Sequence, residues 1–290
     1  MLFCKRMIQV GMSVVFLALG FSANAGNLLL TGHDMDLHCS GGSGCGNYGV
    51  ALNYVRQGAP TKTLPMLVLD EGTQVQSGAN QALAKAKNAV EGAGNAFPMT
   101  VVNPTSAAFA TMPINVTLYS AVVIASDSTC GGCDNSTASI TAINARSAAL
   151  QAFFTAGGGL MYLAGANNRA TYYASVPIPA TGLAVTPPFT ITAAGTALGL
   201  IAADANCCPT HNSFATPAAG SPFVIVETDA AGLPETLIVT GGTVDGGVII
   251  VGPPPVAGPS IGVPSLSAWG LSLLALMVTL MGLFTLRRRA

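Results

Sequence analysis

Residues 120–163 read SAVVIASDSTCGGCDNSTASITAINARSAALQAFFTAGGGLMYL and decide the fold class. Apolar runs at 120–125 and 160–163 have the length of buried strands. Between them, residues 137–155 predict a helix that three consecutive glycines end. Its apolar side chains recur at helical spacing: Ile140, Ile143, Leu150, Phe153 and Phe154. A strand, a helix and a strand in this order predict a parallel pair with a crossover helix.

The same alternation continues on both sides of this unit. Further strands are predicted at 27–32, 64–69 and 99–102, and further helices at 48–56 and 77–92. From about residue 189 the pattern changes to short strands between Gly, Pro and Asp turns, at 189–192, 223–227, 236–239 and 248–251. We therefore expect an α/β domain with a mostly parallel sheet, helices on both faces and antiparallel β additions at the edge.

Residues 28–168 resemble the class I glutamine amidotransferase-like fold, and within it the ThuA-like group. The resemblance rests on LLLTGHD at 28–34, MTVVNP at 99–104, YSAVVIASD at 119–127 and FFTAGGGLMYLAGA at 153–166. It implies a flavodoxin/amidotransferase-like sheet. Amidotransferase-like enzymes carry a nucleophilic Cys at a sharp turn after a strand, whereas residues 164–168 read AGANN here. The resemblance therefore implies a fold but does not imply a hydrolase or amidotransferase mechanism.

The N-terminal residues 1–25 have the layout of a secretory signal peptide. Lys5 and Arg6 precede an apolar stretch at 8–21, and an A-x-A cleavage site ends at Ala25. We expect residues 26–251 to form one exported α/β domain. The Pro- and Gly-rich residues 252–262, GPPPVAGPSIG, are expected to be a linker.

The C-terminal residues 263–290 predict a membrane-spanning segment. Residues 269–286 are 18 uncharged, mostly apolar residues, and as a helix they would be about 27 Å long against a hydrocarbon core of about 30 Å. Trp269 stands where interfacial aromatic residues are common, and Arg287, Arg288 and Arg289 follow the run. Each arginine costs roughly 2.5–3.5 kcal/mol at the bilayer centre, so we expect the arginines to stay cytoplasmic and the domain to lie outside.

The same tail resembles the IPTL-CTERM sorting signal of Gram-negative bacteria. Its motif residues are Val263, Pro264, Ser265, Leu266, Ser267, Trp269 and Gly270, followed by the apolar run and Arg287, Arg288 and Arg289. The resemblance implies anchoring in the inner membrane and processing by an exosortase-like protease. It also implies a domain in the periplasm that is processed to the cell surface or an extracellular matrix, with extracellular polysaccharide as a further candidate partner.

Charge and cysteine content agree with export. Only 8% of the chain is charged, and the twelve acidic residues all lie between the two hydrophobic ends. The domain is therefore mildly acidic and lacks a basic patch, which argues against nucleic acid as a partner. Its six cysteines are an even number, as expected of disulfides in an exported chain: Cys39, Cys45, Cys130, Cys133, Cys207 and Cys208. Neighbour pairing and long-range pairing both remain open.

Polar residues gather after the predicted strands, where ligands bind in open α/β sheets. Candidate ligands for a metal or small molecule are His33, Asp34, Asp36, His38, Asp204 and His211. No cofactor is certain. A divalent metal is a candidate, and oxygen-rich loops with oxidised cysteines would favour Ca²⁺ over Zn²⁺.

Two other interpretations of these residues stay open. In one, disulfides and Asp or Asn side chains only order long exported loops. In the other, His33 or His211 is a general base, with an Asp orienting it, and Thr210, Ser213 or a free Cys is the nucleophile. Asp127 is a further catalytic candidate. We read the domain as a non-catalytic binding or structural module, with an exported hydrolase or metal-dependent enzyme as the alternative.

Overall fold

The computed structural model describes residues 25–38, 45–60, 62–72, 99–131, 133–206, 210–241, 243–245 and 248–250. The chain divides into two compact units, Met1–Gly252 and Pro253–Ala290. Almost all of the predicted signal peptide, the predicted helix at 77–92, the linker and the predicted membrane segment at 269–286 lie outside the described residues. Within the described ranges, no helix is long and apolar enough to cross a membrane.

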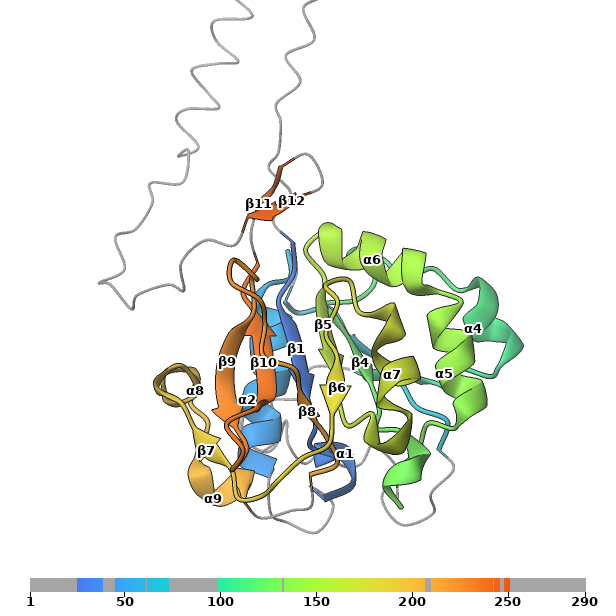
Figure 1. The fold of residues 1–290 in the computed structure, drawn as a ribbon. Coiled ribbons are helices and arrows are strands. Elements are labelled where there is room, and N and C mark those ends of the chain that lie inside the picture. Colours follow the sequence, from blue (N-terminus) through green and yellow to red (C-terminus); the bar gives the residue numbers. More distant parts are fainter. Residues whose placement is uncertain are drawn as a thin grey trace, which may run out of the picture. The chain divides into compact units, whose positions relative to one another are not determined.

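An eight-stranded mixed sheet forms the centre of the first unit (Figure 1). Five strands are parallel: β1 (Leu28–Thr31), β2 (Met66–Leu69), β3 (Met99–Val102), β4 (Ala121–Ile124) and β5 (Gly159–Tyr162). Three antiparallel strands extend the sheet beyond β1: β10 (Pro234–Val239), β9 (Val224–Thr228) and β7 (Thr190–Ile191). The expected mostly parallel α/β sheet with antiparallel additions is confirmed.

The order of the parallel strands is β3-β2-β4-β5-β1. A flavodoxin-like sheet has the order 2-1-3-4-5, in which the first strand lies beside the second. Here β1 pairs with β5 instead, Leu28 opposite Leu160, and β4 and β5 separate it from β2. If β2 were counted first and β1 last, the order would be the flavodoxin order. The sheet is thus a circular permutation of the expected one.

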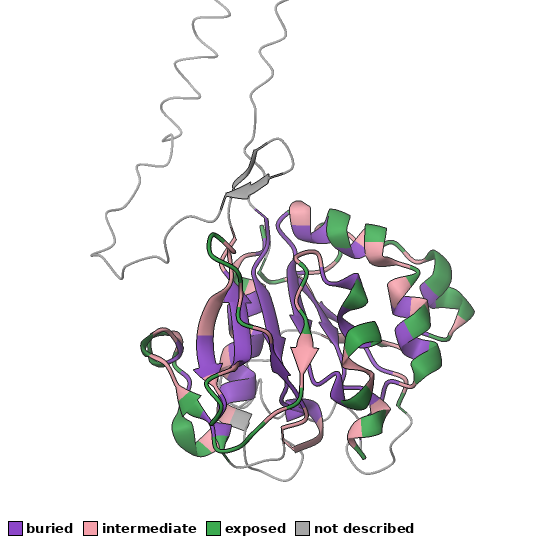
Figure 2. Ribbon diagram, in the orientation of Figure 1, coloured by how far each residue is buried: buried purple, intermediate pink, exposed green. Residues whose placement is uncertain are grey.

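The strands β1, β2, β4 and β5 are buried on both faces, which agrees with their mostly apolar sequences (Figure 2). Leu28 and Leu30 point to one side, where helices α4 (Ala107–Thr111), α5 (Thr137–Asn144), α6 (Ser147–Thr155) and α7 (Arg169–Tyr172) pack. Leu29 points to the other side, which is covered chiefly by α2 (Cys45–Gln57), with Leu198 of α8 (Ala193–Leu198) at its margin. Helices therefore cover both faces, as predicted.

Two of the predicted elements differ in the structure. The helix predicted at 137–155 is interrupted at Ala145 and Arg146, so α5 and α6 are separate helices. Arg146 donates to the carbonyls of Phe109 and Met112, and this places it at the junction instead of inside a helix. The strand predicted at 248–251 is β12 (Val248–Ile250), which pairs only with β11 (Thr243–Asp245) and does not extend the main sheet.

Short elements complete the strand-end edge, the lower edge in Figure 1. The helical ones are α1 (Met35–His38), α9 (Ala202–Ala205), η2 (Ser128–Cys130) and η3 (Ala166–Asn168). A further short helix, η4 (Tyr173–Ser175), follows α7 and packs against α5 and α6. A two-stranded ladder joins β6 (Gly182–Leu183) to β8 (Ser213–Phe214). The bridge between His33 and Thr210 brings the segment before β8 to the end of β1.

Candidate functional site

The residues predicted to form one polar rim lie near the carboxyl ends of the strands but belong to separate clusters. His33 is buried against the antiparallel strands β9 and β10. Asp34, His38 and His211 meet at the surface. Asp36 and Asp127 bond to neighbouring loops, and Asp204 lies beside α2.

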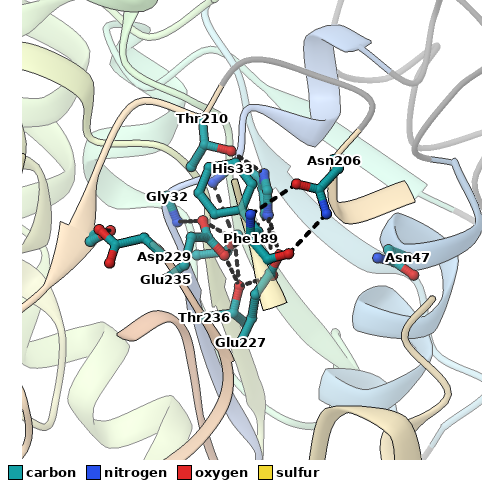
Figure 3. Close-up of polar contacts among 12 residues, drawn as sticks. Gly32, His33, Asn47, Phe189, Asn206, Thr210, Glu227, Asp229, Glu235 and Thr236 are labelled. Atoms are coloured by element: carbon teal, nitrogen blue, oxygen red, sulfur yellow. Dashed lines mark hydrogen bonds and ion pairs between the residues drawn. The ribbon is translucent and has the colours of Figure 1, made fainter. Parts of the chain in front are cut away.

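His33 belongs to a buried ion cluster with Glu227 of β9 and Glu235 of β10 (Figure 3). Its Nε2 lies 3.1 Å from a carboxylate oxygen of each glutamate, and its Nδ1 lies 2.5 Å from the hydroxyl of Thr210. Thr236 and the backbone N–H of Gly32 add hydrogen bonds to the carboxylates. His33 and both glutamates are almost fully buried.

Protonation within the buried ion cluster follows from its charges. Burial opposes the charged form of His33, but the adjacent Glu235 and Glu227 outweigh burial and raise the pKa of His33 well above its ordinary value. Burial likewise disfavours the charge on Glu227, yet His33 holds the pKa of Glu227 below its usual range. Burial and the nearby Glu227 raise the pKa of Glu235 to about 7. The cluster therefore favours a protonated His33, an ionised Glu227 and a Glu235 carboxyl that holds its proton to higher pH than usual.

This protonation state decides what His33 can do. An imidazolium has an N–H on both nitrogens, so Nδ1 donates to the Thr210 hydroxyl and Nε2 donates to the glutamates. A general base must instead accept the nucleophile's proton. The Thr210–His33–Glu227 arrangement has the residue order of a catalytic triad, but His33 already carries the proton it would need to remove. The contacts are those of a buried ion pair.

Asp34, the residue after His33 in the segment between β1 and α1, accepts contacts from two histidines. The same oxygen, Oδ2, lies 3.0 Å from Nε2 of His211 and 3.2 Å from Nε2 of His38. Asp34 is 1% exposed, whereas the His211 and His38 side chains are 21% and 29% exposed. Within the described part of the chain, the buried Oδ1 of Asp34 has no hydrogen-bond partner. We call Asp34, His38 and His211 the surface histidine site.

The electrostatics of this site favour a carboxylate. Burial would raise the pKa of Asp34, but hydrogen bonds from His211 and His38 and their charges lower it below the ordinary value. The hydrogen bond to Asp34 is the largest reason that the pKa of His38 is raised. The carboxylate of Asp34 is thus ionised at neutral pH and available to a cation.

The predicted neighbouring disulfide Cys130–Cys133 is present in the structure. It borders the surface histidine site: Cys133 Sγ lies 3.8 Å from Oδ2 of Asp34, and a sulfur of Cys130 lies within 4.8 Å of both Asp34 and His211 ligand atoms. A disulfide sulfur has no proton to donate and is not a thiolate ligand. Pairing of Cys39, Cys45, Cys207 and Cys208 lies outside the described side chains.

Asp36 ties the end of β1 to the end of β4. Its carboxylate accepts hydrogen bonds of 2.7 Å from both the backbone N–H and the hydroxyl of Ser126. Burial raises the pKa of Asp36 to about 7, although the bonds from Ser126 oppose the shift and nearby Asp34 and Asp134 add to it. Asp36 therefore joins two strand ends instead of facing a ligand.

The crevice between β2 and β4 corresponds to the point where strand order reverses, where ligands bind in open α/β sheets. Here Asn135 occupies it: its amide donates to the carbonyls of Leu69 and Ala125, at the ends of these two strands. Asp127 pairs across a β-bridge with Asn135 and accepts from Thr129 and Asn168. The predicted catalytic candidate Asp127 thus holds loops together beside the Asn135 side chain that bridges the two strand ends.

Asp204 lies apart from these groups. Its carboxylate accepts from the backbone N–H of Asn47, in the first turn of α2, at 2.9 Å. The side-chain amide of Asn47 in turn donates to the carbonyl of Ile201 and accepts from the backbone N–H of Ile201. These contacts attach the α9 region to the start of α2, which explains Asp204 as a helix N-terminal partner.

The turn after β5 has the geometry of a catalytic elbow without its nucleophile. Among the residues that the structure describes, Ala166 is the one non-glycine with positive φ, 44°. It lies buried where the chain passes from β5 into η3 and α7. Such strained positions are common at functional sites, and hydrolases place a nucleophile at a comparable turn. A methyl group at this position cannot attack a substrate.

Sequence reasoning missed Glu227 and Glu235, which decide the state of His33. The available signal was a glutamate inside each of two apolar strands, VIVET and PETLIV, because a buried carboxylate needs a partner. It also missed Tyr173, whose hydroxyl contacts the carbonyls of Thr31 and Leu163 and the amide of Asn212. A tyrosine in a short 3-10 helix gives no comparable signal.

Comparison with known proteins bears on the C-terminal tail. Residues 261–289 match the IPTL-CTERM motif. This motif fits a C-terminal sorting signal of a surface protein and implies processing by an exosortase-like system at the membrane. Neither curated proteins nor solved structures gave a match to the chain, so nothing there supports the ThuA-like resemblance of the domain.

Proposed function

We propose that the chain is an envelope protein of a Gram-negative bacterium, exported through residues 1–25 and held in the inner membrane by residues 269–286. In this proposal the domain lies in the periplasm until an exosortase-like protease releases it to the surface or the extracellular matrix. The observation that carries the proposal is the IPTL-CTERM match at 261–289, which includes Pro264, Trp269 and the three arginines.

We infer that the domain is a binding or structural module instead of a hydrolase. Three observations support this. The adjacent glutamates raise the pKa of His33 well above its ordinary value, which makes it a poor base, the turn after β5 carries Ala166 where a nucleophile would stand, and Asn135 bridges the two strand ends at the strand-order reversal. Polysaccharide of the envelope or matrix is the partner we propose for it.

Sorting predicts a defined change in mass. In cells that possess the protease, the mature wild-type protein is expected to lack Arg287–Arg289, because the tail is cut after the domain has crossed the membrane. Pro264→Ala and Trp269→Ala are expected to keep the full tail and to remain in the membrane fraction, since both alter the motif itself. Intact-mass spectrometry of membrane and released fractions measures both outcomes.

The matched control is Val256→Ala, in the linker before the motif, which is expected to be processed like the wild type. Cells lacking the protease should retain the tail in all variants. A mature wild-type protein that still carries its three arginines in protease-containing cells would contradict sorting and leave a plain membrane anchor.

A further inference from the structure

The backbone at the end of β1 places Asp34 and His38 together. The carbonyl of Asp34 accepts from the N–H groups of Leu37 and His38, so α1 makes one helical turn directly after the strand. Residues four apart on a helix share one face, and His38 Nε2 accordingly reaches back to Asp34 Oδ2 at 3.2 Å.

His211 comes to the same carboxylate from a distant part of the chain. Its backbone N–H donates to the carbonyl of Gly32 at 2.9 Å, next to the bridge between Thr210 and His33. This attachment fixes the His211 backbone beside β1 and leaves its ring 3.0 Å from Asp34 Oδ2. Two partly exposed imidazoles thus face one buried carboxylate.

We propose that Asp34, His38 and His211 bind a divalent transition metal ion, for which Zn²⁺ is the best candidate. This inference goes beyond sorting and is independent of it, because a domain can be sorted with or without a metal. Metal–ligand bonds of about 2.1 Å put two ligands of a tetrahedral ion about 3.4 Å apart. The two nitrogen–oxygen separations here, 3.0 and 3.2 Å, are close to that spacing. The group of ligand atoms within 4.8 Å of one another at Asp34 includes His211 but not His38, so metal binding requires the partly exposed His38 ring to move toward His211.

The unpartnered oxygen of Asp34 is an independent sign of a ligand. A buried carboxylate oxygen without a hydrogen bond costs free energy, and native structures contain few of them. Oδ1 of Asp34 is such an atom in the described part of the chain, and it lies on the carboxylate that both imidazoles contact. A cation at this carboxylate would satisfy it.

The donor set selects the class of metal. Two imidazoles and one carboxylate suit Zn²⁺, Cu²⁺ or Ni²⁺, whereas Ca²⁺ takes six to eight oxygen ligands. The disulfide keeps Cys130 and Cys133 from supplying thiolates. Three protein ligands leave a fourth tetrahedral position open to water or to a group on a partner. Of the two metals left open by the sequence, Ca²⁺ and Zn²⁺, these contacts favour Zn²⁺.

Zinc titration of the full chain tests the proposal. The protein is purified in detergent without reductant, treated with a chelator, and titrated with Zn²⁺ in competition with a chromophoric chelator. We expect one equivalent to bind. His38→Ala and His211→Ala should each raise the dissociation constant at least about tenfold, since even outer-shell partners of metal ligands cost 10–100-fold.

Glu71→Gln is the matched control, because Glu71 is another carboxylate after a strand whose partners are Ser136 and Ser139. It should bind Zn²⁺ like the wild type. Thermal unfolding in chelator checks that the variants fold. The two histidines are partly exposed, so their replacement should leave the fold intact, whereas Asp34→Asn serves as a third variant only if it folds.

Several results would overturn the assignment. These are no stoichiometric zinc binding by the wild type, unchanged binding in the His38→Ala/His211→Ala double variant, or Ca²⁺ binding as tight as Zn²⁺ binding. Binding that requires a reductant would also overturn it, because the metal would then belong to the thiolates of Cys130 and Cys133.

Discussion

Replacing His33 with leucine is expected to lower the free energy of unfolding by about 3–5 kcal/mol, the usual cost of removing one partner of a buried ion pair. His33 is the cation between Glu227 and Glu235, and all three side chains are nearly inaccessible to water. Leucine would leave two carboxyl groups in contact with each other in an apolar interior. Chemical denaturation of the full chain in detergent with chelator present, followed by near-ultraviolet circular dichroism, measures the loss.

The matched control for this prediction is His211→Leu in the same buffer. His211 also contacts a carboxylate, but its side chain is 21% exposed, so its loss should cost about 1 kcal/mol or less. Equal losses for the two variants would contradict the account of His33 as a buried cation. They would also reopen the triad interpretation, in which His33 is neutral.

The second large effect is a decline in stability as the pH rises from 5 to 8. Burial and the nearby Glu227 raise the pKa of Glu235 to about 7, above its unfolded value, so the folded state holds a proton that the unfolded state has lost. Stability is therefore greatest below the unfolded pKa and falls as the pH approaches 7. For a shift of this size the change between pH 5 and 8 is about 2 kcal/mol.

Two other groups act in the same direction. The pKa of Asp36 is raised to about 7 by burial, and the pKa of His33 is raised well above its ordinary value despite burial, by Glu235 and Glu227. The stabilisation from His33 is present below its unfolded pKa and is lost only as the pH rises through the folded pKa. Asp34 and Glu227, whose pKa values are lowered, oppose this trend only as the pH falls below about 4.

Glu235→Gln separates the contribution of Glu235 from the rest. Glutamine resembles the protonated acid, so the variant should lose about 2 kcal/mol of the pH dependence while staying close to wild type at pH 5. Asp36→Asn tests the second site in the same way, since an amide can both accept from and donate to Ser126. Denaturation curves at pH 5, 6, 7 and 8 in chelator measure the slope. A flat wild-type profile would refute both assignments.

The resemblance to amidotransferase-like proteins illustrates how local patterns and topology can diverge. The strand and turn motifs at 28–34, 119–127 and 153–166 form β1, β4 and β5 as that resemblance implied. Yet β1 pairs with β5 at Leu28 and Leu160, not with β2. A strand that is buried on both faces is apolar throughout, so its sequence does not indicate which strand pairs with it. The permuted strand order therefore could not be predicted from these sequences.

The sequence by itself determined the sorting tail and the class of fold. Both depend on local features: an apolar run with a terminal arginine cluster after a short motif, and an alternation of strand and helix patterns along the chain. The same local reading placed His33, Asp34, Asp36, His38 and His211 near strand ends, but it treated them as one rim.

Only the tertiary structure shows that these residues lie in separate clusters. His33 and Asp34 follow β1 as successive residues, and their side chains reach different partners. His33 enters the interior toward Glu227 and Glu235, about two hundred residues away in sequence, and Asp34 meets His211 at the surface. The pKa of His33 is set by burial and by those two distant carboxylates, because a pKa depends on the surroundings in space and not on neighbours along the chain.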